Sequence, residues 1–199
     1  VVAASAPSPA PLALEIIDAL GVDLTPDMAL CLYAAISSDT GSFRFASTTP
    51  ESMRAAARLM GTGIDFAGAA KAMFDTKSRD FLRLQAEVMG DLEVLTAGGV
   101  AVAVIRVSRQ DRDRRGIAFT QVESLIDAVR TVEGVEVAVV LKQDDHGLWR
   151  VSSRSLGAVD VGRACTSQGG GGHVMAAGFT GTTDAQQTLQ GFLDALELD

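Results

Sequence analysis

The chain has 199 residues, of which 47% are hydrophobic, and its mean hydropathy is +0.22. This is enough apolar material for one large domain or two small ones, so intrinsic disorder is not expected. The net charge of −8 leaves no basic excess, which argues against a protein that coats long nucleic acid. This net charge is compatible with a short anionic ligand that a few local arginines hold.

The first 75 residues contain helix patterns. Residues 12–20 (LALEIIDAL) have helical spacing and stop at Gly21, a residue type that favours helix C-termini. Thr25 and Pro26 form a typical helix start, and the apolar run MALCLYAAI that follows predicts a helix buried on nearly all sides. Further helices are expected over residues 50–60 (capped by Thr49), 65–74 and 78–89.

After Met89 the pattern changes to one of strands mixed with helices. VAVAVIRV (100–107) and VEVAVVLK (135–142) are continuous β-branched apolar runs, typical of strands buried on both faces. GLWRVSSRS (147–155) follows the turn DDHG and is expected to be the return strand of a hairpin. Two sets of apolar residues have helical spacing: Val122, Leu125, Ile126 and Val129, and then Leu189, Phe192, Leu193 and Leu196.

These patterns predict an α/β fold class in two parts, with a helical part over 1–75, a linker over 76–79 and a compact α/β domain over 80–199. No stretch of 18 apolar residues occurs, so a membrane span is not expected. The two cysteines form no CxxC pattern, which fits a reducing, cytoplasmic setting. Because the chain begins with Val1 rather than methionine, we expect a fragment or a processed chain.

A run of four glycines in TSQGGGGHVMAAGFT (166–180) is the most unusual segment. Glycines are costly to order, so the run indicates a place where the backbone comes very close to something. Convergent backbone N–H groups in a loop before a helix bind anions, and His173 could donate to a phosphate oxygen. A nucleotide-triphosphate loop would need a lysine that is absent here. A flexible turn followed by a core histidine is the structural alternative.

Two further residues are candidates for chemistry. Arg154 lies at the end of a predicted strand, and arginine suits phosphate, although a solvated surface arginine is the simpler interpretation. Asp39 follows an apolar helix and could bind a divalent cation, although it could equally be a turn residue. The arginines of RVSRQDRDRRG (106–116) alternate with aspartates and are expected to lie in a solvated loop. No HExxH, CxxC or histidine pair occurs, so no local motif builds a metal site.

Two of these segments together resemble a known family. LYAAISSDTGSFRF (32–45), followed more than a hundred residues later by GGGGHVMAAGF (169–179), is similar to the DHH/DHHA1 phosphoesterases. The nearest branch is the bacterial one that degrades very short RNAs, dephosphorylates 3′-phosphoadenosine 5′-phosphate and, in some members, cleaves cyclic dinucleotides. The resemblance implies that residues 1–75 are the C-terminal part of a DHH domain and that 80–199 are a complete DHHA1 domain.

The resemblance also implies roles for individual residues. Asp39 matches a ligand of the family's two-manganese centre, and Arg154 matches its substrate-binding arginine. Gly170, Gly171, Gly172 and His173 match the loop that holds the phosphate and nucleoside end of the substrate. The family's earlier motifs, including the Asp-His-His that names it, do not occur in this sequence, so most metal ligands are missing.

The resemblance therefore implies a manganese-dependent phosphoesterase whose substrates are short RNA, mononucleotides or cyclic dinucleotides. The intact enzyme is expected to be a homodimer. This chain is expected to be only part of that enzyme and to be inactive alone. We expect no partnership with long nucleic acid or with membranes. One alternative is a non-catalytic nucleotide-binding module. Another is a cysteine hydrolase that uses Cys165 with His173 and Asp160, which requires an exposed and activated thiol.

Overall fold

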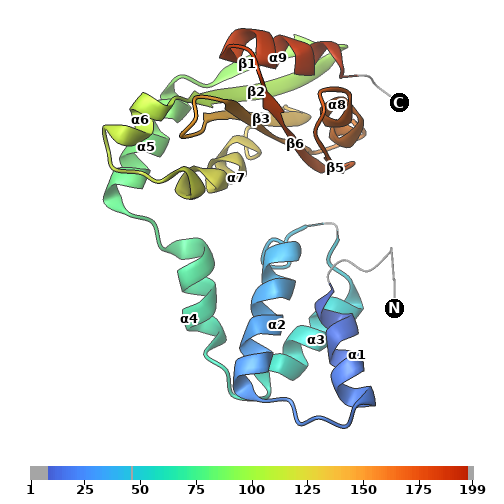
Figure 1. The fold of residues 1–199 in the computed structure, drawn as a ribbon. Coiled ribbons are helices and arrows are strands. Elements are labelled where there is room, and N and C mark those ends of the chain that lie inside the picture. Colours follow the sequence, from blue (N-terminus) through green and yellow to red (C-terminus); the bar gives the residue numbers. More distant parts are fainter. Residues whose placement is uncertain (1–8, 46, 197–199) are drawn as a thin grey trace. The chain divides into compact units, whose positions relative to one another are not determined.

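The computed structural model describes residues 9–45 and 47–196, which divide into two compact units, Val1–Thr76 and Lys77–Asp199 (Figure 1). The helices of the first unit are α1 (Ala10–Ala19), α2 (Pro26–Asp39), α3 (Pro50–Met60) and α4 (Phe66–Ala70), which leads into the π-helical turn η1 (Lys71–Asp75). The helix starts expected from the sequence are confirmed. Thr25 accepts a hydrogen bond from the Met28 amide, and Thr49 forms a capping box with Ser52.

The first unit has a small helical core. Its buried members are Ala10, Leu14, Ala29, Tyr33, Ile36, Ala56, Leu59 and Ile64. The expectation that α2 is buried on nearly all sides is wrong, since Leu30 and Cys31 are exposed. The neighbouring helices α1, α3 and α4 cover only part of α2, so its apolar composition all round does not bury it completely.

The second unit is built on a six-stranded sheet in the order β1-β2-β3-β4-β6-β5 (Figure 1). The strands are β1 (Glu93–Ala97), β2 (Val100–Val107), β3 (Val137–Gln143), β4 (Trp149–Ser155), β5 (Gly171–His173) and β6 (Ala176–Gly181). β2 and β3 are parallel, and every other neighbouring pair is antiparallel. The two apolar strands and the return strand predicted from the sequence are confirmed, and the fold class is α/β as predicted.

Helices cover the two faces of this sheet unequally. On one face α8 (Val161–Ser167) and α9 (Ala185–Asp194) pack on a core that extends from β2 to β6, with Val102, Val139, Val151 and Phe179. On the other face α5 (Arg79–Gly90), the 3₁₀-helix η2 (Phe119–Leu125) and α7 (Ile126–Val129) pack mainly on β2 and β3. The second face of β4, β6 and β5 therefore contributes little to either core.

Two segments differ from their sequence-based predictions. The helical face over residues 122–129 is buried as expected, but its first half is 3₁₀-helix rather than α-helix. The arginine-rich segment is not simply a solvated loop, because it contains the short helix α6 (Arg109–Asp113). Arg112 is only 2% exposed and donates to the backbone oxygens of Ile117 and Gln143. Arg112 is buried because these carbonyl oxygens, which are shielded from water, need hydrogen-bond donors.

Candidate functional site

The alternation of side chains along β4 creates a polar surface on the less covered face of the sheet. Val151, Ser153 and Ser155 are buried on the helix-covered side, while the residues between them point the other way. Strand pairing extends this surface over β6 and β5. We call it the open face; its members are Arg150, Ser152, Arg154, Gly171, His173, Ala176, Gly178 and Thr180.

Two of the residues expected to bind substrate lie in one row of the open face. Arg154 is paired with Ala176 on β6, and Ala176 is paired with His173 on β5. Residues paired across strands share a face, and two strand spacings amount to about 10 Å. The fold thus brings the Arg154 and His173 positions together although 18 residues separate them in sequence.

Arg154 carries a charge that has no carboxylate in ion-pair contact within residues 9–45 and 47–196. Its guanidinium is half-buried and donates one hydrogen bond, of 2.9 Å, from Nη1 to the Ser153 carbonyl. Burial lowers the pKa of Arg154, Asp127 opposes that shift, and Arg130 adds to it. Arginine nevertheless stays charged at neutral pH, so this cation is available to an anionic ligand.

The glycine run is explained mainly by contacts within the protein. A Cβ at Gly170 would collide with the backbone of Gly178 and Phe179, and one at Gly172 would lie 2.5 Å from the Ala176 oxygen. The last two glycines of the run are part of β5, and the next element is β6 rather than a helix, so the prediction of an anion nest in a loop before a helix is wrong. Of the four glycines in the described run, Gly171 alone both lies in the β5–β6 hairpin and has open space where a side chain would be.

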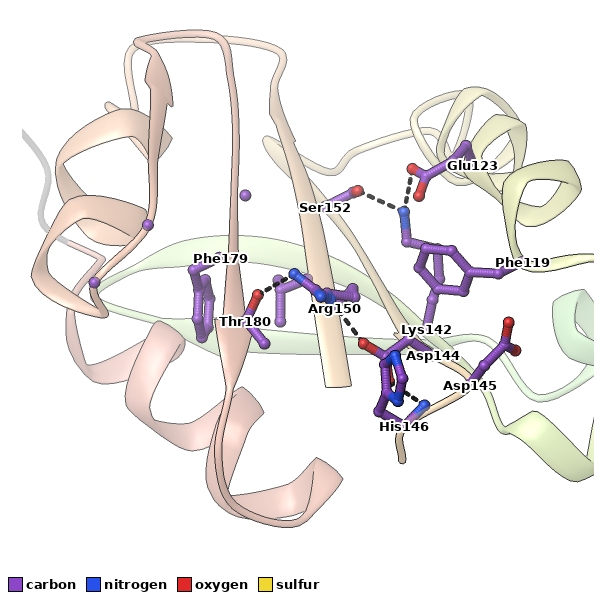
Figure 2. Close-up of a pocket in the computed structure, with 14 residues that line it drawn as sticks. Phe119, Glu123, Lys142, Asp144, Asp145, His146, Arg150, Ser152, Phe179 and Thr180 are labelled. Carbon is purple, nitrogen blue, oxygen red and sulfur yellow. Dashed lines mark hydrogen bonds and ion pairs between the residues drawn. The ribbon is translucent and has the colours of Figure 1, made fainter. Parts of the chain in front are cut away.

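Beside the Arg154–His173 row lies a hollow of about 620 Å³ (Figure 2). It is lined by Phe119 and Glu123 of η2, by Lys142 of β3, by the β3–β4 turn, by Arg150 and Ser152, and by parts of the glycine run and β6. Gly170 lines this hollow, whereas Arg154 and His173 lie outside it on the same face. Arg154 and His173 therefore form an open row of side chains next to a hollow.

The hollow contains a buried lysine that the sequence analysis missed. Lys142 is 1% exposed, forms an ion pair with Glu123, and donates to Ser152 Oγ at 2.8 Å (Figure 2). Burial lowers the pKa of Lys142, and Glu123 opposes that shift. The signal in the sequence was the lysine in the strand pattern VAVVLKQ. A lysine in a buried strand needs a charged partner, because an unpaired charge is rarely buried.

Asp39 lies in the first unit, apart from these residues in the chain. It is the last residue of α2 and is exposed. In the described part of the chain no group of three or more His, Cys, Asp or Glu side chains could hold a metal ion. Divalent cations need several oxygen or imidazole ligands, so these residues do not by themselves fit a metal centre.

The cysteine-hydrolase alternative is not supported by the geometry. Cys165 is fully buried in α8, with Sγ 3.4 Å from Ser153 Oγ, and burial raises the pKa of its thiol. Asp160 is engaged as the N-cap of α8, where it accepts a hydrogen bond from the Arg163 amide. A protonated, inaccessible thiol is a poor nucleophile.

Comparison with known proteins identifies the second unit. Its fold is that of an α/β domain with a glycine–histidine hairpin at the edge of an open sheet face. The family model described as "DHHA1 domain" matches residues 98–198. The chain belongs to the DHHA1 domain family, which confirms the resemblance seen in the sequence.

The relatives extend this likeness to most of the chain. The "Bifunctional oligoribonuclease and PAP phosphatase NrnA" of Thermus thermophilus is 33% identical over 186 residues, which cover 92% of this chain and 54% of the relative. The protein of the same name from Bacillus subtilis is 25% identical, over 79% of this chain and 49% of its own length. The chain thus spans about half the length of the curated relatives it matches.

A solved structure shows the same fold. An exopolyphosphatase-related protein from Bacteroides fragilis superposes with a TM-score of 0.85 at 23% identity, covering 96% of this chain and 56% of that one. No helix in the described residues is both long and apolar enough to cross a membrane.

The burial of Cys165 predicts different reactivity for the two thiols. In the native chain Cys31 is exposed and should react with a thiol reagent within minutes, whereas Cys165 should react only after unfolding. Titration with Ellman's reagent, with and without guanidinium chloride, checks this. Rapid reaction of two thiols in the native protein would contradict the burial and reopen the hydrolase alternative.

Gly171 and Gly172 provide a matched pair of substitutions. Gly172 has a φ of 146° and no room for a Cβ, so Gly172→Ala should destabilise the protein by about 2 kcal/mol or more. Gly171→Ala fills open space and should change stability by less than about 1 kcal/mol. Urea denaturation of both variants measures the difference, and equal losses would show that the hairpin is packed differently.

Proposed function

We propose that the chain is the substrate-binding part of a metal-dependent phosphoesterase for short oligoribonucleotides and 3′-phosphoadenosine 5′-phosphate. The relatives are named as enzymes with these two activities. The observation that carries the proposal is the row of Arg154 and His173 on the open face, with an arginine that has no ion-pair partner in the described residues. A half-buried cation that no carboxylate contacts in the described residues favours a phosphate ligand, although Asp127 and Glu123 act on it at longer range.

The proposed division of labour is that the open face binds and the catalytic centre lies elsewhere. Arg154 would hold a substrate phosphate, and His173 would donate to it from the neighbouring strand. Gly171 leaves the approach to the sheet free of side-chain atoms. Binding of the far end of a short substrate would position its scissile bond.

We propose that Asp39 is this chain's contribution to a manganese centre. Manganese suits carboxylate ligands, and Asp39 is accessible at the end of α2. Since the described residues hold no cluster of ligands around it, further ligands must come from groups outside residues 9–45 and 47–196. When bound, such metals supply an activated water and stabilise charge on the phosphoryl group. Cyclic dinucleotides are a further substrate class that the same site could take.

A non-catalytic nucleotide-binding module is the second candidate function. It is supported by the same row of Arg154 and His173, which needs no metal to bind an anion, and by the lack of a metal-ligand cluster in the described residues. Two free cysteines, one exposed, support a reducing, cytoplasmic environment for either function.

Arg154→Ala should weaken binding of a 5′-phosphorylated dinucleotide by about 1.5–3 kcal/mol, the range for a hydrogen bond to a charged group. Titration calorimetry at fixed low salt measures this. Arg83→Ala is the matched control, because Arg83 is an exposed arginine of α5 that pairs only with Asp80 among the described residues. Equal affinities of Arg154→Ala and the unaltered chain would remove Arg154 from the site.

The chain of 199 residues should release no mononucleotides from a dinucleotide when manganese is added, because one carboxylate cannot hold two divalent ions. In a longer protein that contains this chain and is active, Asp39→Ala should lower kcat by at least about 100-fold. Robust manganese-dependent turnover by the highly purified chain would overturn this prediction and with it the proposed role of Asp39. A module without catalysis would show binding but no turnover in either form.

A further inference from the structure

The hollow beside Arg154 has its own chemical character. Its charged side chains are paired: Lys142 with Glu123, Arg150 with Asp144 at 2.9 Å, and Asp145 with the buried Arg112 at 2.8 Å. Opposite charges in contact cancel most of their field at a distance. The hollow is therefore balanced in charge, whereas Arg154 next to it is contacted by no carboxylate in the described residues.

An aromatic ring forms part of the wall of this hollow. Phe119 is half-buried, with the Arg112 guanidinium 5.5 Å and the Lys142 ammonium 5.7 Å from its ring centroid (Figure 2). Both cations are almost completely buried, so they hold the ring in place from within the domain. A fixed aromatic ring at the surface of a hollow is a platform on which a planar ligand can stack.

Two hydroxyl groups of the lining are oriented by their neighbours. Ser152 Oγ accepts a hydrogen bond from Lys142 at 2.8 Å, and Thr180 Oγ1 accepts one from Arg150 at 2.6 Å. A hydroxyl that accepts from a cation keeps its own proton free to donate. Within the described residues, neither proton has an acceptor, so both are available to ring nitrogens, carbonyls or sugar hydroxyls of a ligand.

We propose that this hollow is a nucleoside subsite, in which Phe119 stacks on the base of a nucleotide whose phosphate is held at Arg154. The proposal rests on the proposed function and specifies its ligand. Charge balance, a fixed ring and two directed donors suit an uncharged base and sugar better than a second phosphate. Ser152 lines the hollow and lies two residues from Arg154 along β4, about 7 Å, so one ligand can reach both.

The test separates the base from the phosphate by comparing adenosine 5′-monophosphate with ribose 5-phosphate. Both ligands are titrated into the full chain and followed by protein NMR, which measures weak affinities. Phe119→Ala should weaken binding of the adenosine nucleotide about tenfold, the loss expected when a stacked base loses its ring, and change that of ribose 5-phosphate less than about twofold. Arg154→Ala should weaken both ligands to a similar extent.

Two further variants keep the result interpretable. Phe119→Leu retains apolar volume against Arg112 and Lys142, so it should fold normally and show the same selective loss. Leu148→Ala is the control, because Leu148 is an exposed apolar residue of the β3–β4 turn outside the lining, and it should affect neither ligand. Unchanged nucleotide affinity in both Phe119 variants, or equal losses for the two ligands, would overturn the subsite. Failure of the unaltered chain to bind either ligand would instead overturn the proposed function and the subsite with it.

Discussion

The pairing of β4 with β6 determines what the open face presents. Val151 is opposite Phe179 in that pair, and both side chains are buried in the core under α8 and α9. Ser153, two residues after Val151 on the same face, is fully buried, and its hydroxyl donates to the Ala177 carbonyl at 3.0 Å. Because side chains alternate along a strand, these contacts force Ser152 and Arg154 onto the opposite face. A slip of one residue would bury the arginine and expose the core.

The same pairing accounts for the small residues of the hairpin. Gly170 and Gly172 have no room for side chains because the run lies directly against the backbone of β6. Gly178 is equally restricted, since a Cβ there would lie 2.6 Å from the Val151 oxygen. The glycines therefore let three segments of backbone meet at the edge of the sheet, and the position of His173 follows from that packing. Gly171 differs from these glycines, because the space where its side chain would be is open.

Local sequence patterns were sufficient for much of this fold. Thr25 and Thr49 cap helices as predicted, and the runs over 100–107 and 135–142 form the central strands because few other structures bury continuous β-branched residues. What local patterns could not show is pairing between distant segments. That Arg154 and His173 share a row depends on β6 lying between β4 and β5, a non-local arrangement that neither segment encodes alone.

Local sequence patterns also do not show which side chains meet in the hollow. Lys142, Glu123 and Arg112 are common surface residue types. The apolar run before Lys142 is a signal for its burial, whereas the charged neighbours of Arg112 give none. The burial of Lys142 and Arg112 becomes favourable only when η2, β3 and the β3–β4 turn supply carboxylate and carbonyl partners together. For Arg112, the charged composition of its segment predicted a solvent-exposed side chain, but tertiary hydrogen bonds hold the side chain buried.

The surroundings of Arg154 are compatible with the anion binding proposed for this acidic chain. The net charge of −8 is spread over the whole chain and is screened within about 8 Å at physiological salt, so its effect at one site is modest. Arg154 acts within that range, half-buried and without a contacting carboxylate in the described part of the chain. The proposed binding of a short anion therefore depends on the charge at the Arg154 position rather than on the net charge of the chain.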